Sequence, residues 1–269
     1  METPDALGVI AGSGVYPQLL AQSARRAGVS RIVAAAFENE TDPKLASLAD
    51  EIEWMRVGQL GRLTKFFAST GIRQAIMAGQ IAPKNLFEFR PDMKALVVLA
   101  RLKRRNAESL FGAIADELAK AGVELLPATS FMDDYLARAG LIAGRALTRR
   151  EGDDVEFGFT IAKEVSRLDI GQTVIVKGGT VLAVEAFEGT NDAIRRGGTL
   201  ARKDGVIVKV SKPNQDLRFD VPVIGTETIR IAAEAKIRVI AVEANRTLLL
   251  ETNAVRDAAH AAGLSIVGR

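Results

Sequence analysis

Short apolar runs alternate with amphipathic segments through the first half of the chain. The apolar runs predict strands at 7–11, 31–37, 74–78 and 123–126, and the segments whose apolar residues recur every three or four positions predict helices at 17–26, 60–69, 93–103 and 108–120. Strands that alternate with helices are typical of a parallel sheet covered by helices on both faces. We therefore expect an α/β fold that begins with a doubly wound, Rossmann-like parallel sheet.

The pattern changes after Pro127, where two apolar runs follow each other without a helix between them. They flank Lys177-Gly178-Gly179-Thr180, and glycines between apolar runs are typical of a β-hairpin turn. This half predicts helices at 155–168, 191–200, 226–235 and 253–262, and strands at 173–176, 181–186, 206–210, 239–243 and 247–250. We expect an N-terminal Rossmann-like domain at 1–132 and a C-terminal α/β domain with a mixed sheet at 133–269.

Composition narrows the classes of protein and of site. The 269 residues exceed the usual size of a single compact core, and 48% of them are hydrophobic. The absence of cysteine excludes disulfides, thiolate zinc sites and cysteine nucleophiles. The polar N-terminus lacks the pattern of a signal peptide, and no apolar run approaches the ~20 residues of a spanning helix. We therefore expect a soluble, cytoplasmic protein.

Basic residues cluster although the net charge is only +3. The clusters lie at 101–105, 149–150 and 195–196, and they suit an anionic partner such as a phosphorylated substrate or a lipid surface. The simpler interpretation of the run at 101–105 is a solvated helix face. Aromatic residues make up only 5% of the chain and no stacking motif accompanies the charges, so we do not expect a nucleic-acid partner.

The most informative segment lies between Pro213 and Pro222. It places Asp216, Arg218 and Asp220 at every second position, with apolar residues between them. On an extended backbone the charged side chains project from one face and the apolar ones from the other. The charged face then suits a metal ion or a phosphate, and the prolines restrict the backbone at both ends. The alternative is an ion triad on an exposed edge strand, which contributes little to stability.

A glycine-rich turn follows the first predicted strand. Gly12, Ser13 and Gly14 precede a helix that starts at Pro17, and the N–H groups of a helix N-terminus attract anions. A phosphate fits there, but a tight turn without a ligand explains the glycines equally well. The dinucleotide-binding pattern is incomplete because Pro17 occupies its third glycine position, although Glu38 lies where a ribose-binding acid is expected.

A second loop follows the strand at 74–78. Gly79, Gln80 and Lys84 combine a glycine with amide and ammonium groups. Ligands of open parallel sheets collect at the carboxyl ends of the strands, so this loop can lie beside the first one. The alternative is a plain connection between a strand and a helix.

A third polar segment follows the hairpin. Glu188 and Asp192 are candidates to join Asp216 and Asp220 at a divalent cation, because hard ions such as Mg²⁺ prefer carboxylate oxygens. Gly189 lies between them. Alternatively, Thr190 or the residue after it caps the following helix.

Four segments, at 8–17, 78–84, 185–192 and 212–225, together resemble the UDP-2,3-diacylglucosamine pyrophosphatases of lipid A biosynthesis, the LpxI family. The resemblance spans nearly the whole chain, and its most specific part is Gln215-Asp216-Leu217-Arg218-Phe219-Asp220. It implies hydrolysis of UDP-2,3-diacylglucosamine to 2,3-diacylglucosamine 1-phosphate (lipid X) and UMP, by attack of water on the α-phosphorus with Mg²⁺. It also implies a homodimer and two domains with the lipid between them. We further expect transient contact with the inner-membrane surface.

The resemblance also assigns roles to residues. It makes Asp220 or Asp216 the essential aspartate, and we expect Arg218 to pair with the phosphate or hold the carboxylates. Candidate Mg²⁺ ligands are Asp220, Asp216 and Asp192. Candidate substrate-binding residues are Gly12, Ser13, Gly14, Gly79, Gln80, Lys84, Glu188, Gly189, Thr190 and Gln215.

Two other functions compete with this one. The first is an oxidoreductase that binds a dinucleotide at the Gly12–Gly14 turn, with Glu38 on the ribose. The second is a sensor that binds nucleotide-sugar lipids without turnover.

Overall fold

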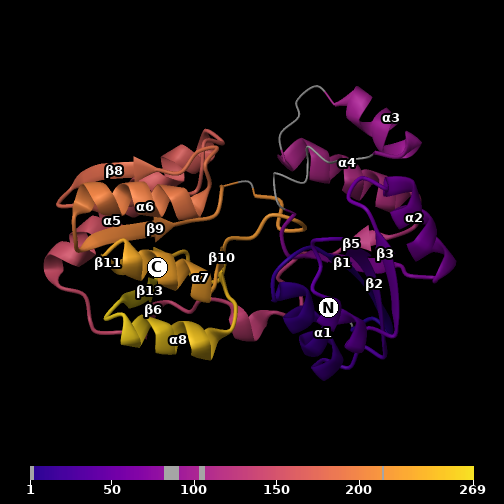
Figure 1. Cartoon of the computed structure of the whole chain (residues 1–269), viewed down its shortest axis with the longest axis horizontal. Coiled ribbons are helices and arrows are strands. Elements are labelled where there is room, and N and C mark those ends of the chain that lie inside the picture. The colour runs from indigo at the N-terminus through magenta and orange to yellow at the C-terminus, as the bar shows by residue number, and fades with distance from the viewer. Residues whose placement is uncertain (1–2, 82–90, 103–106, 214) are drawn as a thin grey trace. The chain divides into compact units, whose positions relative to one another are not determined.

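The computed structural model describes residues 3–81, 91–102, 107–213 and 215–269. Contacts divide the chain into two units (Figure 1): unit 1 consists of Met1–Met132 and Asp216–Asp220, and unit 2 of Asp133–Gln215 and Val221–Arg269. The sequence analysis assigned all residues after 132 to one domain. The five residues Asp216–Asp220 instead make their contacts with unit 1, because the chain leaves unit 2 after Gln215 and re-enters it at Val221.

Unit 1 contains a five-stranded sheet in the order β3-β2-β1-β4-β5, and all its neighbouring strands are parallel. The strands are β1 (Ala6–Ala11), β2 (Arg31–Phe37), β3 (Glu51–Met55), β4 (Gln74–Ala78) and β5 (Glu124–Leu125). The predicted doubly wound parallel sheet is confirmed. Strand β3 was missed because it lies at the sheet edge and alternates glutamates with apolar residues, so no continuous apolar run marks it.

Helices cover this sheet and bury its apolar side chains. They are α1 (Tyr16–Arg26), α2 (Leu60–Ser69), α3 (Met93–Arg101) and α4 (Ala107–Lys120), with a short 3₁₀ helix, η1 (Pro43–Ser47). Phe67 of α2 and Leu118 of α4 are fully buried among strand residues such as Val33 and Ala75. Burial of these side chains is the main stabilising contribution to unit 1.

Unit 2 contains a six-stranded mixed sheet in the order β6-β13-β11-β9-β7-β8. The strands are β6 (Gly140–Ala143), β7 (Thr173–Lys177), β8 (Thr180–Val184), β9 (Gly205–Lys209), β11 (Ile237–Val242) and β13 (Ser265–Gly268). Strands β9, β11 and β13 are parallel, whereas β6, β7 and β8 pair antiparallel with their neighbours. The predicted mixed sheet is confirmed. Two further short strands, β10 (Val223–Ile224) and β12 (Leu248–Leu249), pair with each other.

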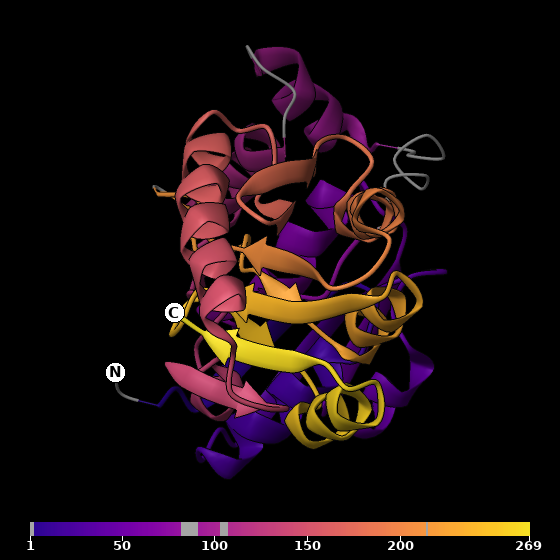
Figure 2. The same ribbon diagram turned by 90° about the vertical axis from the view of Figure 1, so that its left-hand side faces the viewer.

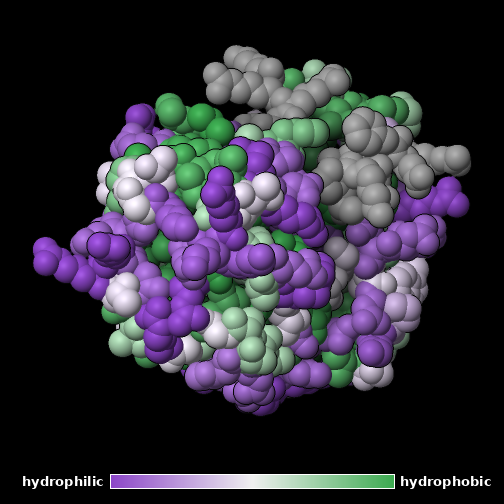
Figure 3. Space-filling model, turned by 60° about the vertical axis from the view of Figure 1, so that its left-hand side comes forward, coloured by the Kyte–Doolittle hydropathy of each residue, from purple (hydrophilic) through white to green (hydrophobic). Residues whose placement is uncertain are grey.

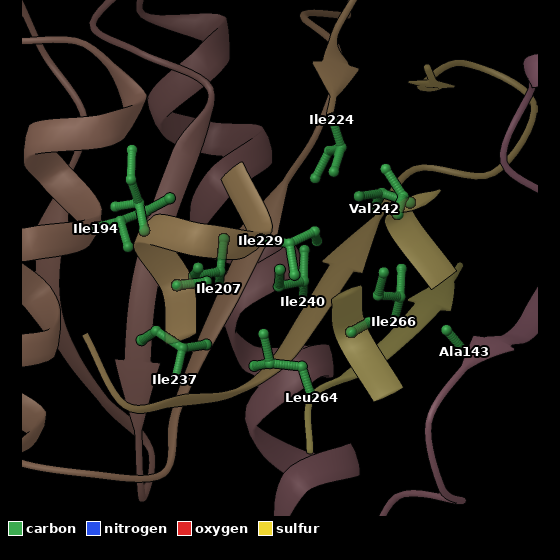
Figure 4. Packing of buried hydrophobic residues seen from close by; sticks show 14 of the residues in the cluster. Ala143, Ile194, Ile207, Ile224, Ile229, Ile237, Ile240, Val242, Leu264 and Ile266 are labelled. Atoms are coloured by element: carbon green, nitrogen blue, oxygen red, sulfur yellow. The ribbon is translucent and has the colours of Figure 1, made fainter. Parts of the chain in front are cut away.

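Alternation along the strands of unit 2 separates two apolar layers. Val174, Val206 and Val208 pack on the face covered by α5 (Arg149–Arg167). Ile175 and Ile207 point to the other face, which is covered by the helices α6 (Thr190–Ala201), α7 (Thr226–Glu234) and α8 (Thr252–Ala261) (Figures 2 and 4). Both faces are therefore buried, which explains the continuous apolar runs at the centres of β7 and β9. A 3₁₀ helix, η3 (Asp133–Tyr135), begins the unit.

The hairpin turn between β7 and β8 forms where the glycines predicted it. Gly178 and Gly179 have φ angles of 57° and 71°, a conformation that costs glycine little. The carboxylate of Asp154 accepts hydrogen bonds from both N–H groups, at 2.8 and 2.7 Å. Buried Asp154 on α5 thus fixes the turn to the helix that covers the sheet.

Candidate functional site

The strand order of unit 1 reverses between β1 and β4, and the two glycine loops meet at that point. Strands β2 and β3 lie on one side of β1, and β4 and β5 lie on the other. Ser13 donates from its N–H to the Gln80 carbonyl at 2.7 Å, and the Gln80 N–H donates back to the Ser13 carbonyl at 3.2 Å. The prediction that these loops lie side by side is confirmed. Such a reversal is where open α/β sheets bind ligands.

Two of the glycines are there because the loops approach so closely. A Cβ on Gly12 would lie 2.5 Å from the carbonyl oxygen of Gln80. A Cβ on Gly79, whose φ is +92°, would lie 2.5 Å from that of Ser13. Gly14 differs, because its φ is +87° but a Cβ there would meet no atom within 4 Å. The turn is therefore open at Gly14, and a ligand can approach the backbone from that side.

The N-terminus of α1 offers fewer donors than the sequence indicated. Pro17 has no N–H, and the N–H groups of Gln18 and Leu19 both donate to the Val15 carbonyl at 3.1 Å. The N–H and hydroxyl of Ser13 both donate to the Gln80 carbonyl, so an anion at this turn would depend mainly on the backbone at Gly14. Pro17 and the bond from Gln18 therefore reduce the number of N–H groups that this helix end offers to an anion.

Residues Asp216–Asp220 form a turn, so the prediction of an extended strand is wrong. The N–H groups of Phe219 and Asp220 donate to the Asp216 carbonyl at 3.3 and 3.1 Å. An Asp216 side-chain oxygen also accepts the N–H of Arg218 at 3.1 Å, the local bond by which aspartate favours turns. Backbone groups bonded in this way are not available to a strand ladder. We call these five residues the Asp216 turn.

A bidentate ion pair holds the charged side chains of the Asp216 turn. Arg218 donates from Nη2 and Nε to the two carboxylate oxygens of Asp216, at 2.6 and 2.9 Å. The hydrogen bond from Arg218 is the main reason that the pKa of Asp216 lies below its ordinary value. The carboxylate of Asp216 is therefore ionised and already committed to the guanidinium.

Aromatic stacking fixes the turn to α4. The ring of Phe219 stacks on that of Phe111, with centroids 5.6 Å apart, and the Arg218 guanidinium lies 5.9 Å from the Phe219 centroid. Phe111 belongs to α4 of unit 1. The apolar half of the motif therefore does anchor it, as the sequence indicated, but through a turn.

One backbone group connects the turn to the glycine loops. The N–H of Ala128 donates to the Leu217 carbonyl at 2.7 Å, and the Ala128 carbonyl accepts from the hydroxyl of Tyr16. Burial raises the pKa of Tyr16, so its hydroxyl keeps the proton that it donates. Tyr16 starts α1, two residues after Gly14. Three of the sequence-predicted regions are thus assembled within unit 1.

Sequence reasoning missed both residues of this connection. Ala128 acts through its peptide group, and no side-chain pattern reveals that role. Tyr16 had one available signal: a buried tyrosine needs a partner for its hydroxyl, and one directly after the glycine turn places that partner near the loop.

The predicted residues after the hairpin lie in unit 2 and have local partners. Glu188 accepts a hydrogen bond from Arg196, which lowers its pKa, and Asp192 accepts from Arg195 at 2.6 Å. Gly189, with φ +83°, is the N-cap of α6, so the alternative that Thr190 or its neighbour caps this helix is wrong. The Thr190 hydroxyl instead donates to Glu185 at 2.6 Å.

Two polar networks in unit 2 hold the chain on either side of the Asp216 turn. Upstream, the N–H and hydroxyl of buried Ser211 each donate to Glu243 at 2.7 Å, and Lys163 donates to the same oxygen at 2.6 Å. Downstream, Nζ of buried Lys209 donates to the Val223 carbonyl at 3.3 Å and to the Thr190 hydroxyl at 3.2 Å. Both networks lie at the carboxyl ends of parallel strands, and they fix where the chain leaves and re-enters the unit.

The remaining candidates concern polar donors and a metal. Gln215 accepts the N–H of Lys212 at 2.7 Å, while its amide nitrogen is buried and has no hydrogen-bond partner among the described residues. Such a donor suits a ligand oxygen. Lys84 lies outside the described residues. No group of three histidine, aspartate or glutamate side chains that could hold a metal occurs in the described part of the chain.

Comparison with known proteins covers both halves of the chain. The LpxI N-terminal domain matches residues 6–135, and the LpxI C-terminal domain matches residues 138–267. The chain belongs to the LpxI family. A relative from Caulobacter vibrioides, named UDP-2,3-diacylglucosamine pyrophosphatase LpxI, is 33% identical over 97% of this chain and 96% of its own length. The Asp216 turn lies in the part matched by the C-terminal LpxI domain, although its contacts are with unit 1.

We expect Gly12→Ala to destabilise unit 1 by about 1–3 kcal/mol, because the new methyl group overlaps the backbone of Gln80. Trp54, the single tryptophan, lies in β3 of unit 1, so its fluorescence during urea unfolding measures this change. The matched control is Gly112→Ala in α4, where a Cβ meets no atom within 4 Å. That control should be neutral or slightly stabilising. Equal stability of Gly12→Ala and the parent protein would contradict the close packing of the loops.

We expect Glu243→Gln to destabilise unit 2 by about 1–3 kcal/mol at pH 7, because three charge-assisted hydrogen bonds weaken. Burial alone would raise the pKa of Glu243, but the bonds from Lys163 and Ser211 outweigh it, and the pKa lies below the ordinary value of 4.5. The stabilisation is therefore present above pH 4.5 and is lost as the pH falls through the lower, folded-state pKa.

Urea unfolding followed by circular dichroism at pH 7 and at pH 3.5 measures this difference. The difference in the free energy of unfolding between Glu243→Gln and the parent protein should shrink at the lower pH. The unfolding curve followed by the fluorescence of Trp54, which reports on unit 1, should be the same for both proteins. Glu234→Gln, which removes an exposed pair with Arg230, is the matched control and should cost no more than about 0.5 kcal/mol. A Glu243→Gln effect that stays constant between the two pH values would contradict the assignment.

Proposed function

We propose that this protein hydrolyses UDP-2,3-diacylglucosamine to 2,3-diacylglucosamine 1-phosphate (lipid X) and UMP, by attack of water on the α-phosphorus. The observation that carries the proposal is the match of the whole chain to a relative named for this pyrophosphatase activity. The geometry supports it, because a glycine-lined sheet edge and a turn with two carboxylates and a guanidinium lie in one unit. Lipid A biosynthesis is the pathway to which the product belongs.

The charge of the pyrophosphate sets the chemical requirement. Attack of water on an anionic phosphorus needs positive charge beside the phosphate oxygens and a group that aligns the water. Arg218, fixed by Asp216 and stacked beside Phe219, supplies positive charge in a defined orientation. We assign Asp216 to positioning Arg218. We assign Asp220, four residues on in the same turn, to orienting water or a cation by the chemistry of its carboxylate.

Mg²⁺ belongs to the proposal as an ion shared with the substrate. The carboxylate oxygens of Asp216 are used by Arg218, and Oδ1 of Asp192 accepts from Arg195. The described residues do not bring three protein carboxylates together at a metal site. Mg²⁺ commonly binds through one or two carboxylates together with substrate phosphates and water, and Asp220 has the right donor chemistry for that role. Bound there, the ion would neutralise developing charge on the phosphate oxygens.

Other residues of the proposal bind the polar parts of the substrate. Ser13 and Gly14 lie on the open side of the loop pair, where the nucleotide or sugar phosphate can approach the backbone. Gln80 is exposed beside them, and Gln215 carries the unsatisfied amide. A homodimer and transient contact with the inner-membrane surface complete the proposal.

The dinucleotide-dependent oxidoreductase is the weaker candidate. Glu38, its proposed ribose ligand, instead forms an ion pair with Arg56, with 3.3 Å between Nε and Oε2. The family match also points to a hydrolase. Titration with NADH, followed by fluorescence, checks this: we expect no specific binding in the micromolar range.

We expect Asp220→Asn to lower kcat for UMP release by roughly 100-fold or more, because the carboxylate that aligns the water or cation is lost. Asp216→Asn should lower it by about 10- to 100-fold, because Arg218 loses its bidentate partner. The measurement is UMP release from UDP-2,3-diacylglucosamine in detergent micelles. Exposed Asp257 on α8 provides the matched control, and Asp257→Asn should retain activity within about twofold. Full hydrolysis by both turn variants would overturn the assignment of this site.

Chelation tests the metal separately. EDTA is expected to lower UMP release by roughly 100-fold, and added Mg²⁺ should restore it, because no other charge replaces the ion at the phosphate oxygens. The same titration with Asp220→Glu should shift the Mg²⁺ concentration needed for half of the maximal rate. An unchanged rate in EDTA would remove Mg²⁺ from the proposal while leaving the hydrolase itself intact.

A further inference from the structure

Helix α3 of unit 1 lacks a polar face. Its nine residues include only two charged side chains, Lys94 and Arg101, and the others are apolar. Ala95 and Val98 are buried against the core of unit 1. An ordinary surface helix would carry polar residues opposite this buried side. On α3 the opposite side is apolar as well, which indicates that this side contacts a binding partner.

The outer side of α3 is one continuous stripe. Met93, Leu96 and Val97 are 75%, 46% and 45% exposed, and their spacing of three and four places them on one helix face. In the described part of unit 1, these are the only large hydrophobic residues that are strongly exposed. Figure 3 colours one face of the surface by hydropathy and shows green hydrophobic atoms at the top of the view. Exposed apolar side chains gathered in this way indicate an interaction surface.

A cavity with basic walls adjoins the stripe. It has a volume of about 820 Å³, and its walls combine the apolar Phe66 and Met93 with the ammonium groups of Lys65 and Lys94. The acidic group of Asp92 in the same wall is used by the helix ends, accepting from the N–H groups of Gly61 and Ala95 at 2.6 and 2.9 Å.

Positive charge exceeds negative charge around the stripe. Glu53 in the cavity wall pairs with Arg62, and Glu117 of α4 serves both Lys94 and Lys120. Arg101 adds a further exposed cation at the C-terminal end of α3. An apolar stripe bordered by cations matches an anionic phospholipid surface, where acyl chains lie just below phosphates.

We propose that the outer face of α3, together with the neighbouring cavity, binds an anionic membrane surface. Met93, Leu96 and Val97 enter the interface between headgroups and acyl chains, and Lys65, Lys94 and Arg101 meet the phosphates. A second copy of the chain fits this face less well, because symmetric pairing of the stripe would bring its own cations together. No helix in the described residues is long and apolar enough to cross a membrane.

The proposal gives the membrane contact of the proposed function a location, and it rests on that function only for the lipid nature of the substrate. None of its residues belongs to the Asp216 turn or to the glycine loops. A short helix with three inserted side chains anchors weakly, so binding should be reversible and should weaken with salt. Membrane binding and hydrolysis can therefore fail separately.

Flotation of the full chain with vesicles tests the proposal. We expect binding to phosphatidylcholine vesicles that contain 40% phosphatidylglycerol, on the order of 10-fold weaker binding to phosphatidylcholine alone, and loss of binding at high salt. The variant Met93→Ser/Leu96→Ser/Val97→Ser should lose roughly 10-fold or more in partitioning. Lys65→Gln/Lys94→Gln should lose affinity only for the anionic vesicles.

A matched control replaces three equally exposed apolar residues of unit 2. Leu141, Leu168 and Ile170 are 52%, 58% and 49% exposed, and Leu141→Ser/Leu168→Ser/Ile170→Ser should bind vesicles like the parent protein. All variants should keep UMP release from micellar substrate and the same thermal unfolding midpoint, which separates membrane binding from catalysis and folding.

Three results would overturn the proposal. They are the absence of flotation by the parent protein, equal flotation with neutral and anionic vesicles, and equal loss of binding in the α3 variant and the unit 2 control. Light scattering after gel filtration adds a fourth: a change of oligomeric state caused by the α3 variant, without a change in flotation, would assign this face to a second copy of the chain.

Discussion

The peptide group of Ala128 holds the candidate site together. Its N–H and its carbonyl point to two segments that are far apart in the sequence, bonding Leu217 on one side and Tyr16 on the other. A buried peptide group left without partners costs free energy, so neither contact can be dropped cheaply. Through this one group, the helix after the glycine turn and the Asp216 turn take fixed positions within unit 1.

The charges of the site depend on that arrangement. Once the turn is fixed, Arg218 and Asp216 form a bidentate pair, and Phe219 packs on Phe111 of α4. Asp216 and Asp220 look equivalent in the sequence, but the ion pair gives Asp216 a separate role, because its carboxylate binds the guanidinium of Arg218. This is the physical reason for assigning different roles to Asp216 and Asp220 in the proposed hydrolysis.

Unit 2 contributes the two ends from which the turn extends. Ser211 is held by Glu243 and Lys163, and Val223 is held by Lys209, each at the carboxyl end of a parallel strand. The surrounding strands are largely apolar, so these polar groups are paired with one another in a buried setting. The Asp216 turn can therefore leave unit 2 and contact unit 1 while the chain on both sides of it stays fixed in unit 2.

Most of the fold could be predicted from the sequence, because burial of one face of a helix or strand makes apolar residues recur at a regular spacing. The parallel sheet of unit 1, the mixed sheet of unit 2 and the Gly178-Gly179 turn all followed from runs and spacings. Edge strands such as β3 and β6 were not predicted, because one side of each faces water and their pattern of apolar residues is weaker. The meeting of the two glycine loops was also predictable, because parallel strands bring their carboxyl ends to one edge.

The sequence by itself determined which residues are candidates for the chemistry, through the density of charged and glycine residues in four short segments. Only the tertiary structure decided their geometry. The Asp216 turn alternates polar and apolar residues as a strand does, yet no strand among the described residues pairs with it. The carbonyl and carboxylate of Asp216 form local hydrogen bonds instead. Its contacts with Phe111 and Ala128 join residues about a hundred positions apart. Such contacts depend on packing between distant segments, which local periodicity does not encode.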